Sequence, residues 1–539
     1  MKNTNFYIKL PFLLGIAISA GILIGARMTD TGVNPKSPLS SIMKFREIVN
    51  YVKNDYVDEV DTDELIEDAI AHMLDELDPH SVYIPSEQAQ LAKSELEGGF
   101  DGIGIEFSII RDTIYVVAPL NGGPSEQLGI KTGDKIISVD GEKVAGIGIT
   151  NRGVFERLRG PKGSKVEVGI KRKGKQDFLA FDIIRDKIPQ YSVDVGYMVD
   201  KETGYIKISR FSATTYTEFK TQLRELKESG MKNLIVDLQG NPGGYLDRAV
   251  DVVDELLGGN ELIVYTKGKD SKYDSEARAQ RKGLFETGPV IVLIDQGSAS
   301  GSEIVAGALQ DNDRALVVGR RSFGKGLVQR PISLSDGSEL RLTISRYYIP
   351  SGRSIQKPYG EDDEYDKDIS DRFRNGELFH EDSIHVNDSL KFETLNGREV
   401  FGGGGIVPDH FVSIDTLESS AYLNRLFTSN AIGEFTLKYY QDNKKRLEKM
   451  DFEDYRLDFE VTEKDLNELI KTGKSVGVEF DEEGYERSKD VLKTHLKAQI
   501  ARRVWDNDGF YPIFNETNEV FQEALELLEQ AETLAQNYR

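Results

Sequence analysis

Pro289-Val-Ile-Val-Leu-Ile-Asp295 is followed directly by Gln296-Gly-Ser-Ala-Ser-Gly-Ser-Glu303, and the rest of the chain is organised around these two segments. The first is short, rich in Val and Ile and bounded by turn residues, which predicts a buried strand. The residues after it return to a helical pattern at Ile304-Val-Ala-Gly-Ala-Leu-Gln310. The serines therefore lie on a strand-to-helix turn, where unpaired backbone N–H groups can bind an anion or an oxyanion.

Three serines in this turn compete for the role of nucleophile: Ser298, Ser300 and Ser302. Ser300 comes where the turn should meet the helix, so its hydroxyl would project from the helix start and the Gly301 N–H could face developing negative charge. We therefore take Ser300 as the candidate nucleophile. Ser300-x-x-Glu303 is also the pattern of a capping box, in which two side chains satisfy unpaired N–H groups. The turn alone leaves both interpretations open, and caps are the commoner of the two.

A serine nucleophile needs a base, and none of the six histidines lies in the Gly-rich segments that resemble site loops. This weakens a Ser-His-Asp triad but leaves it open, since triads assemble from distant parts of a sequence. Lys325, in Ser322-Phe-Gly-Lys-Gly-Leu-Val-Gln329, is the better candidate. A lysine buried among apolar neighbours loses its charge easily and can accept the serine proton. Gln329 could hydrogen-bond that amine and orient it. The alternative is an ordinary surface lysine.

Gly319-x4-Gly324-Lys325 also matches most of a phosphate-binding P-loop. The match fails twice, because Gly326 stands where a Ser or Thr would ligate Mg²⁺ and because residues 327–331 predict a strand where a P-loop needs a helix. We therefore reject a nucleotide site.

Two segments, Gly297-Ser-Ala-Ser-Gly-Ser-Glu-Ile-Val-Ala-Gly-Ala-Leu-Gln-Asp311 and Ser322–Gln329, together resemble the bacterial carboxyl-terminal processing proteases. These are PDZ-containing Ser/Lys peptidases of the S41 type with a crotonase/ClpP-like α/β serine protease core. The resemblance implies Ser300 as nucleophile, Lys325 as general base and Gln329 as the residue that orients the lysine. Many relatives carry Ala where this chain has Gly301, and only the backbone N–H is needed there.

The composition excludes several classes of protein. A chain of 539 residues can bury more than one core. Its net charge of −23 argues against nucleic acid as a main partner, because phosphate binding needs basic surface. The chain has no cysteine, which excludes disulfides, cysteine nucleophiles and thiolate metal sites. We predict no metal and no organic cofactor.

Residues 1–27 carry the one membrane signal. Lys2 and Lys9 precede an uncharged apolar run, residues 10–26, which Arg27 ends. The run is slightly short for a spanning helix, which usually needs about 20 apolar residues. No good small-x-small cleavage site follows it, so a signal anchor is favoured over a cleaved signal peptide. The lysines before it predict export of the rest to the cell envelope, anchored in the inner membrane with the catalytic region in the periplasm.

The chain is predicted to be a multidomain α/β protein with five regions. They are the anchor at 1–27, a linker and N-terminal helices at 28–97, a PDZ β-domain at 98–186, a peptidase core at 187–415 with a polar insertion at 358–396, and a helical C-terminal region at 416–539. The insertion is interpreted as a solvated segment or lid, since charge runs usually lie on solvated surface. Leu77-Asp-Pro-His-Ser-Val-Tyr83 resembles a segment that precedes the PDZ domain in the same family, and His80 there is interpreted as a turn residue rather than a catalyst.

The PDZ prediction rests on a β-rich unit with a Gly-rich loop at its start. Gly102, Ile103, Gly104 and Ile105 resemble the loop whose backbone N–H groups capture a chain terminus while the peptide adds a strand. A generic Gly-rich hairpin is the alternative for the loop alone. Arg159 stands where relatives place an arginine linked to activation by substrate.

Asp237-Leu-Gln-Gly-Asn-Pro-Gly-Gly244 follows a predicted strand as a turn whose glycines expose backbone N–H groups. In the resembled family this segment supplies an oxyanion-hole N–H, which we assign to Gly243 or Gly244 with the Gly301 N–H as its partner. A simple tight turn is the alternative.

The region after residue 415 is charged and helical, without a catalytic motif. Its apolar positions could line a core or a protomer interface, and relatives use terminal helices to dimerise, so a homodimer and an adaptor or activator are candidate partners. A stand-alone helical cap is the alternative.

Together these features predict a serine endopeptidase that binds the exposed C-terminal tails of proteins or peptides through its PDZ domain and hydrolyses peptide bonds through an acyl-enzyme. Two alternatives remain. A non-catalytic PDZ scaffold would bind tails without cutting them, but its dyad should be altered, and here the dyad is intact. An acyl-thioester enzyme of crotonase-like architecture would need a coenzyme A site, and the PDZ unit and the predicted export oppose it.

Overall fold

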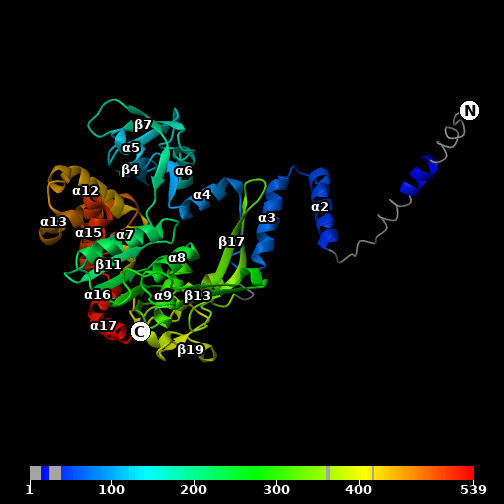
Figure 1. The fold of residues 1–539 in the computed structure, drawn as a ribbon. Helices are drawn as coiled ribbons and strands as arrows, with labels where there is room; N and C mark the ends of the chain where they lie inside the picture. The colour runs from blue at the N-terminus through cyan, green and yellow to red at the C-terminus, as the bar shows by residue number, and fades with distance from the viewer. Residues whose placement is uncertain (1–13, 23–37, 121, 360–363, 415–417, 539) are drawn as a thin grey trace, which may run out of the picture. The chain divides into compact units, whose positions relative to one another are not determined.

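A computed structural model of the chain describes residues 14–22, 38–120, 122–359, 364–414 and 418–538 (Figure 1). Contacts divide the chain into two units, Met1–Leu77 and Asp78–Arg539, and each is described by itself. The first unit is helical where it is described: residues 14–22, α2 Pro38–Asp55 and α3 Thr62–Asp75. Of the predicted anchor only residues 14–22 are described, and none of the helices that the structure describes is long and apolar enough to cross a bilayer.

A six-stranded sheet of order β10-β11-β12-β15-β16-β21 forms the centre of the second unit. Neighbouring strands are parallel from β11 onward, whereas β10 pairs antiparallel with β11. The strands are β10 Val193–Met198, β11 Thr203–Ile208, β12 Asn233–Asp237, β15 Val290–Ile294, β16 Leu316–Gly319 and β21 His410–Phe411. β15 is the apolar run predicted from the sequence, and it is buried along its whole length, as parallel strands covered on both faces are.

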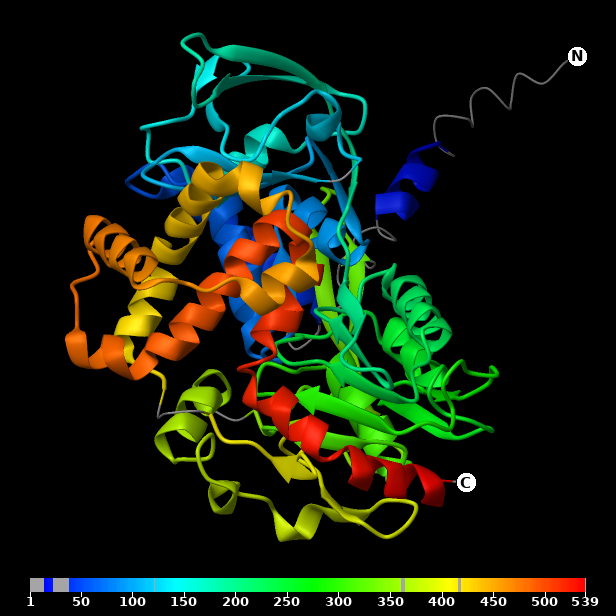
Figure 2. The ribbon, with the colours of Figure 1, turned by 90° about the vertical axis from the view of Figure 1, so that its left-hand side faces the viewer.

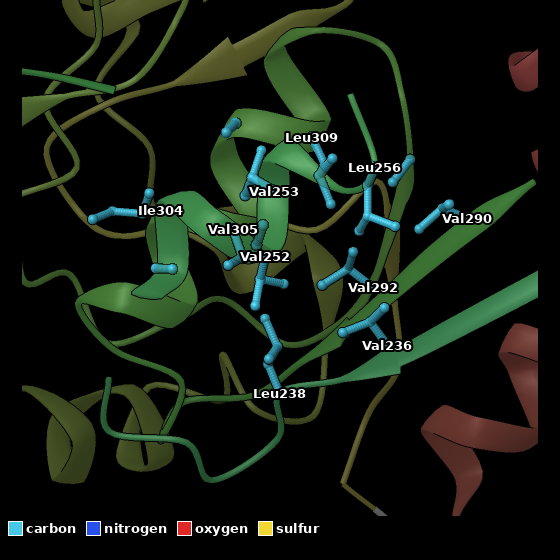
Figure 3. Close-up of a cluster of buried hydrophobic side chains, with 14 of the residues drawn as sticks. Val236, Leu238, Val252, Val253, Leu256, Val290, Val292, Ile304, Val305 and Leu309 are labelled. Atoms are coloured by element: carbon cyan, nitrogen blue, oxygen red, sulfur yellow. The ribbon is translucent and has the colours of Figure 1, made fainter. Parts of the chain in front are cut away.

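Helices cover both faces of this sheet. On one face lie α7 Thr215–Glu228, α8 Leu246–Asp254 and α9 Gly301–Asp311. Figure 3 shows apolar side chains of α8 and α9 directed at Val236 of β12 and at Val290 and Val292 of β15. The alternate residues Ile235 and Ile291 point to the other face, where α16 Glu519–Glu526 and α17 Leu528–Asn537 cover them. These two helices, red in Figure 2, thus make the end of the chain part of the core.

A second sheet holds the strand that follows Lys325. Its order is β1-β18-β13-β14, and β17 pairs antiparallel with β18. The strands are β1 Val82–Ile84, β13 Leu262–Gly268, β14 Ser275–Arg278, β17 Leu327–Ser333 and β18 Glu339–Tyr348. Because β17 is a strand, the helix that a P-loop requires after Lys325 is absent from this described segment.

The β-rich unit near the start of the chain has a sheet of order β3-β4-β5-β7-β8, with β6 beside β5. Its elements are β3 Ile105–Ile109, β4 Ile114–Pro119, α5 Pro124–Gln127, β5 Lys135–Val139, β6 Glu142–Lys143, α6 Asn151–Leu158, β7 Lys165–Lys171 and β8 Leu179–Ile184. A separate ribbon of β2 Gly99–Gly102 and β9 Asp186–Pro189 joins its two ends. The unit has its own apolar core.

The C-terminal region is helical, as predicted. It contains α11 Ala421–Thr428, α12 Ala431–Leu447, α13 Phe452–Asp458, α14 Glu463–Ser475 and α15 Glu482–Phe514. Their apolar residues line a core of their own. The region is not a stand-alone cap, because α15 is hydrogen-bonded to Asp194 on β10. The Tyr511 hydroxyl donates to Asp194 Oδ2 at 2.7 Å, and the Asn507 amide donates to the Asp194 carbonyl at 3.1 Å.

The remaining elements connect these parts. They are α4 Ser86–Leu96, the 3-10 turns η1 Ser271–Tyr273, η2 Glu381–Ser383 and η3 Asp388–Leu390, helix α10 Glu364–Arg374, and the hairpin of β19 Lys391–Glu393 with β20 Glu399–Phe401.

Candidate active site

Ser300 lies between β15 and α9, at the N-terminal end of the helix, as the sequence predicts. Its backbone has φ 52° and ψ −110°, whereas an ordinary N-cap residue is extended with negative φ. A left-handed φ is rare for a residue with a side chain and marks a turn that its surroundings hold in a strained form. Strain of this kind is found where a sharp strand-to-helix turn presents a nucleophile.

The hydroxyls of the other two serines of the turn are hydrogen-bonded to backbone carbonyls. The Ser298 hydroxyl donates to the Leu238 carbonyl at 2.8 Å, and the Ser302 hydroxyl donates to the Asn241 carbonyl at 2.9 Å. Both side chains are fully buried, whereas Ser300 is half-buried. Of the three candidates, Ser300 is therefore the one that a substrate can reach.

Lys325 lies on the loop Ser322–Gly326, which enters β17. Burial lowers the pKa of its amine, the charge of Glu303 raises that pKa, Arg341 lowers it and Asp78 raises it. Among the described residues, we find no hydrogen bond or ion pair to the Lys325 Nζ. A partly buried amine with a lowered pKa can be neutral and accept a proton, unlike a surface lysine.

The Glu303 carboxylate joins the serine turn to the lysine loop. Its Oε2 accepts the N–H of Ser300 at 2.8 Å and the N–H of Lys325 at 2.9 Å. Its Oε1 accepts the N–H of Gly324 at 2.7 Å and the hydroxyl of Ser322. Burial raises the pKa of Glu303, while these donors favour its charged form. The predicted capping box of Ser300 and Glu303 is therefore present, and the same carboxylate also accepts the backbone N–H of Lys325.

Tyr347 is a second residue that connects the serine turn to the lysine loop, and the sequence did not predict this contact. Its hydroxyl lies 3.1 Å from the Ser300 carbonyl oxygen and 2.6 Å from the Lys325 carbonyl oxygen, and the side chain is fully buried on β18. A tyrosine 22 residues beyond Lys325 carries no local signal for such a contact. The only indication was its place in an apolar, aromatic strand.

Gln329 lies on β17, and its amide nitrogen donates to the Thr343 hydroxyl at 3.3 Å. The predicted hydrogen bond from the Lys325 amine to Gln329 is not formed among the described residues. The amide carbonyl oxygen of Gln329 is therefore the end of the side chain that is left for the lysine.

The two glycines proposed for the oxyanion hole differ. The Gly243 N–H donates to Asn241 Oδ1 at 2.8 Å, so this group is already occupied. Gly243 lies against the serine, since a Cβ built on it would stand 2.6 Å from the Ser300 Cβ and 2.8 Å from the Gly301 nitrogen. The N–H groups of Gly244 and Gly301 have no backbone or side-chain acceptor within the described part of the chain. Because the Gly243 N–H is occupied, the Gly244 N–H is the candidate that is left as the partner of Gly301.

The polar insertion is not simply solvated, which corrects the interpretation of residues 358–396. Arg372 and Glu377 are buried, and an Arg372 guanidinium N–H donates to the Ser322 carbonyl at 2.7 Å. Just before the insertion, the Lys357 N–H donates to the Gly324 carbonyl at 2.9 Å. The charges are buried because they pair with one another, as in the ion pair of Arg321 with Glu377.

In the predicted peptide-binding loop of the PDZ domain, residues 102–105, the side chains and the backbone N–H groups have different surroundings. The side chains of Ile103 and Ile105 are buried in the core of the β-rich unit, and Gly104 has φ +72°. The Ile103 carbonyl accepts the Ser125 hydroxyl at 2.6 Å, and the Gly104 carbonyl accepts the Leu120 N–H at 3.0 Å. Within the described residues, no backbone acceptor faces the N–H groups of Ile103 and Gly104.

Arg159 follows α6, and its guanidinium stacks over the rings of Phe100 and Phe155 at 4.2 and 4.4 Å. It lies near the loop, because a Cβ on Gly102 would stand 3.8 Å from the Arg159 Cα. His80 is a turn residue with a lowered pKa of about 4, caused first by burial and then by the charge of Lys325.

Comparisons with known proteins agree with this architecture. Residues 202–365 match the model of peptidase family S41, residues 102–182 that of the PDZ domain, and residues 24–88 that of the activating protease CtpB N-terminal domain. Residues 422–506 match a family of unknown function.

The carboxy-terminal-processing protease of Bartonella bacilliformis is 37% identical over 349 residues, which are 64% of this chain and 79% of that protein. The carboxy-terminal processing protease CtpB of Bacillus subtilis is 37% identical over 58% of this chain and 65% of its own length. A solved photosystem II D1 C-terminal processing protease matches 70% of this chain and 87% of its own chain at 26% identity, with a TM-score of 0.35. On the family models and the two sequence relatives, the chain belongs to peptidase family S41, and it is a serine-type peptidase with a PDZ domain.

Proposed function

We propose that Ser300 is the nucleophile of this peptidase, that Lys325 is its general base, and that the enzyme cleaves proteins which present a free C-terminal tail. Gln329 is proposed to orient the amine, and the N–H groups of Gly301 and Gly244 to hold the oxyanion. The names of the relatives, carboxy-terminal processing proteases, support the choice of substrate.

One observation carries the proposal: the shared carboxylate of Glu303, which accepts N–H groups from both Ser300 and Lys325. It ties the two loops to one point, while burial lowers the pKa of the lysine amine. A nucleophile and a base held at fixed positions need little reorganisation when they react.

The reaction is an acyl transfer. The neutral Lys325 amine takes the Ser300 proton, and the serine oxygen attacks the scissile carbonyl carbon. The Gly301 and Gly244 N–H groups stabilise the oxyanion. The intermediate collapses to an ester on Ser300, and the Lys325 ammonium gives its proton to the leaving amine. Lys325 then takes a proton from water, whose oxygen attacks the ester carbon. The bond from that carbon to the Ser300 oxygen breaks, the Lys325 ammonium returns the proton to the serine oxygen, and the new carboxylate is released.

The PDZ domain is proposed to bind the tail of the substrate. The N–H groups of Ile103 and Gly104 would receive the terminal carboxylate, and the peptide would add a strand beside β3. Arg159, stacked on Phe155 of α6, is the proposed sensor of the bound tail.

The apolar run before Arg27 is proposed to anchor the enzyme in the inner membrane and to place the catalytic region in the periplasm. A homodimer and an adaptor or activator remain proposed partners.

The test compares the full chain with Ser300→Ala and Lys325→Ala on a loosely folded protein that has an apolar C-terminal tail. Ser229→Ala and Lys282→Ala, at exposed positions of the same peptidase region and remote in the chain from both loops, are the matched controls. We expect both site variants to lose at least about 1,000-fold in kcat while the controls keep it. Tail binding should persist in every variant.

A second arm uses the same substrate with its terminal carboxyl blocked as an amide. We expect KM to rise, since the PDZ loop loses its charged partner. Cleavage by Lys325→Ala at the parent rate would refute the assignment of Lys325 as the general base. A parent that binds tails but never cuts them would favour the non-catalytic scaffold.

A further inference from the structure

Asp78 lies in the turn before β1, and this turn is hydrogen-bonded to β18. It is 8% exposed, and its carboxylate accepts four donors. Oδ1 accepts the N–H groups of His80 and Ser81, both at 2.9 Å, and Oδ2 accepts the Ser81 hydroxyl at 2.6 Å. The fourth donor is the Thr343 hydroxyl, 3.0 Å from Oδ1. The turn is also fixed to the strand, because the Thr343 N–H donates to the Ser81 hydroxyl at 3.1 Å.

The chemistry of these groups fixes the direction of the next hydrogen bond. An ionised carboxylate can only accept, so the single hydroxyl proton of Thr343 points to Asp78. The Thr343 oxygen then has only lone pairs to offer Gln329, 3.3 Å away. A side-chain amide has one donor end and one acceptor end. The Gln329 NH₂ group must therefore face Thr343, and its carbonyl oxygen must face away.

We infer that Asp78, acting through Thr343, fixes the amide of Gln329 so that its carbonyl oxygen, and not its NH₂ group, is presented to the Lys325 amine. Asp78 and Thr343 are positioning residues, since neither is placed to touch substrate. The inference rests on the proposed role of Lys325.

The orientation matters because of what a neutral lysine needs. Its lone pair must point to the Ser300 hydroxyl, so its N–H bonds need an acceptor elsewhere. A Gln329 carbonyl oxygen is such an acceptor, whereas a flipped NH₂ group would compete as a donor. The other charged groups that act on the amine are Glu303, Arg341 and Asp78 itself. His80 is close enough to be affected by the lysine charge, but its pKa of about 4 leaves it neutral at pH 7.

The central test is Thr343→Val in the full chain, which keeps the shape of the side chain and removes the hydroxyl. We expect kcat to fall about tenfold, with KM changed less than about twofold, because the base is misoriented while the substrate site is intact. Thr343→Ser restores the hydroxyl and should restore kcat.

Thr266→Val is the matched control. Thr266 is a buried threonine on β13, the neighbouring strand of the same sheet, and its hydroxyl lies 2.8 Å from the Tyr273 carbonyl oxygen. The variant also loses a buried hydrogen bond, so it should lower the melting temperature without changing kcat.

A double-mutant cycle decides whether Thr343 acts through Gln329. In a Gln329→Ala background, Thr343→Val should have no further effect on kcat, since the amide to be oriented is gone. An equal tenfold loss in both backgrounds would overturn the inference, as would a Thr343→Val variant with the kcat of the parent. Ser300→Ala distinguishes a failure of the proposed function from a failure of this inference. If Ser300→Ala cuts like the parent, the proposed function fails. If Ser300→Ala is inactive while Thr343→Val is fully active, only the inference is refuted.

Discussion

The serine turn, residues 295–303, and the lysine loop, residues 322–326, are held by different sets of contacts. Within the turn, Asp295 Oδ1 accepts the Gly297 N–H at 2.9 Å and Glu303 accepts the Ser300 N–H at 2.8 Å. The loop instead depends on distant residues, such as Gln356, which accepts the Gly326 N–H at 2.8 Å, and Arg372. The serine turn is thus held by its own residues and by the segment 238–241, whose Leu238 and Asn241 carbonyls accept the Ser298 and Ser302 hydroxyls. The lysine loop is held by Glu303 and by residues that come later in the chain.

This difference indicates which substitutions should change the activity of the enzyme most. The strained φ of Ser300 needs a rigid frame, and β15 and α9 provide it in sequence. The lysine loop lies between sheets and the insertion, so its geometry and the pKa of its amine depend on several elements at once. Residues that touch both parts should matter most.

The largest effect is expected for Glu303→Gln, because Glu303 is the residue that contacts both the serine turn and the lysine loop. Glutamine has one acceptor oxygen where glutamate has two, so it cannot hold all four donors. We expect kcat to fall about 100-fold, because the nucleophile and base lose their common support. Steady-state kinetics on a peptide substrate measure this.

Asp465→Asn is the control for that variant. Asp465 closes a capping box with Thr462 at the start of α14, far along the chain from the site. It should lose about 1 kcal/mol of stability and no activity. A Glu303→Gln variant as active as Asp465→Asn would contradict the shared role of Glu303.

An intermediate effect is expected for Tyr347→Phe. The change removes the hydroxyl that lies within hydrogen-bond distance of the Ser300 and Lys325 carbonyl oxygens, so both carbonyls lose this contact. We expect kcat to fall about tenfold and stability by about 1–3 kcal/mol. Tyr455→Phe removes a buried hydroxyl that donates to the Lys497 carbonyl at 2.9 Å, and should lower stability only. Equal kcat in the two variants would show that Tyr347 does not link the loops.

The smallest effect is expected for Arg341→Gln, which acts on the pKa of Lys325 and leaves the serine turn unchanged. Burial is the main cause that lowers the pKa of Lys325, and the charge of Arg341 lowers it further. Arg341→Gln should therefore raise that pKa. Since the base acts when neutral, activity rises as pH passes the pKa, so the acid limb of kcat/KM should move to higher pH, with the plateau changed less than about twofold.

Arg346→Gln tests whether the shift is specific. Arg346 lies on the same strand, and its guanidinium donates to the Tyr359 hydroxyl at 3.1 Å. Its pH profile should match the parent. An acid limb that moves to lower pH in Arg341→Gln would contradict Lys325 as the base.

Much of the fold was readable from the sequence because the signals are local. The strand at Pro289–Asp295, the helix after Ser300 and the strand after Lys325 all follow from composition and turn residues, and the structure has each of them. The resemblance to S41 peptidases is confirmed by the family comparison.

The contacts that assemble the site could not be read in the same way. Glu303 was visible only as a capping residue, and neither Tyr347 nor Arg372 has a neighbour in sequence that indicates its partner. The insertion looked solvated because charge predicts exposure unless the ion pairs are known in advance. Which of Gly243 and Gly244 keeps a free N–H depends on the Asn241 side chain, which accepts the Gly243 N–H.

The most direct test of the Ser300–Lys325 dyad is to trap the acyl-enzyme. The full chain is mixed with a peptide ester substrate, quenched in acid during turnover, digested and analysed by mass spectrometry. We expect an acyl adduct on the fragment with Ser300, fragmented to that residue, and none in Ser300→Ala or in Lys325→Ala at the same time point. An adduct on Ser298 or Ser302, or an undiminished adduct in Lys325→Ala, would contradict the account.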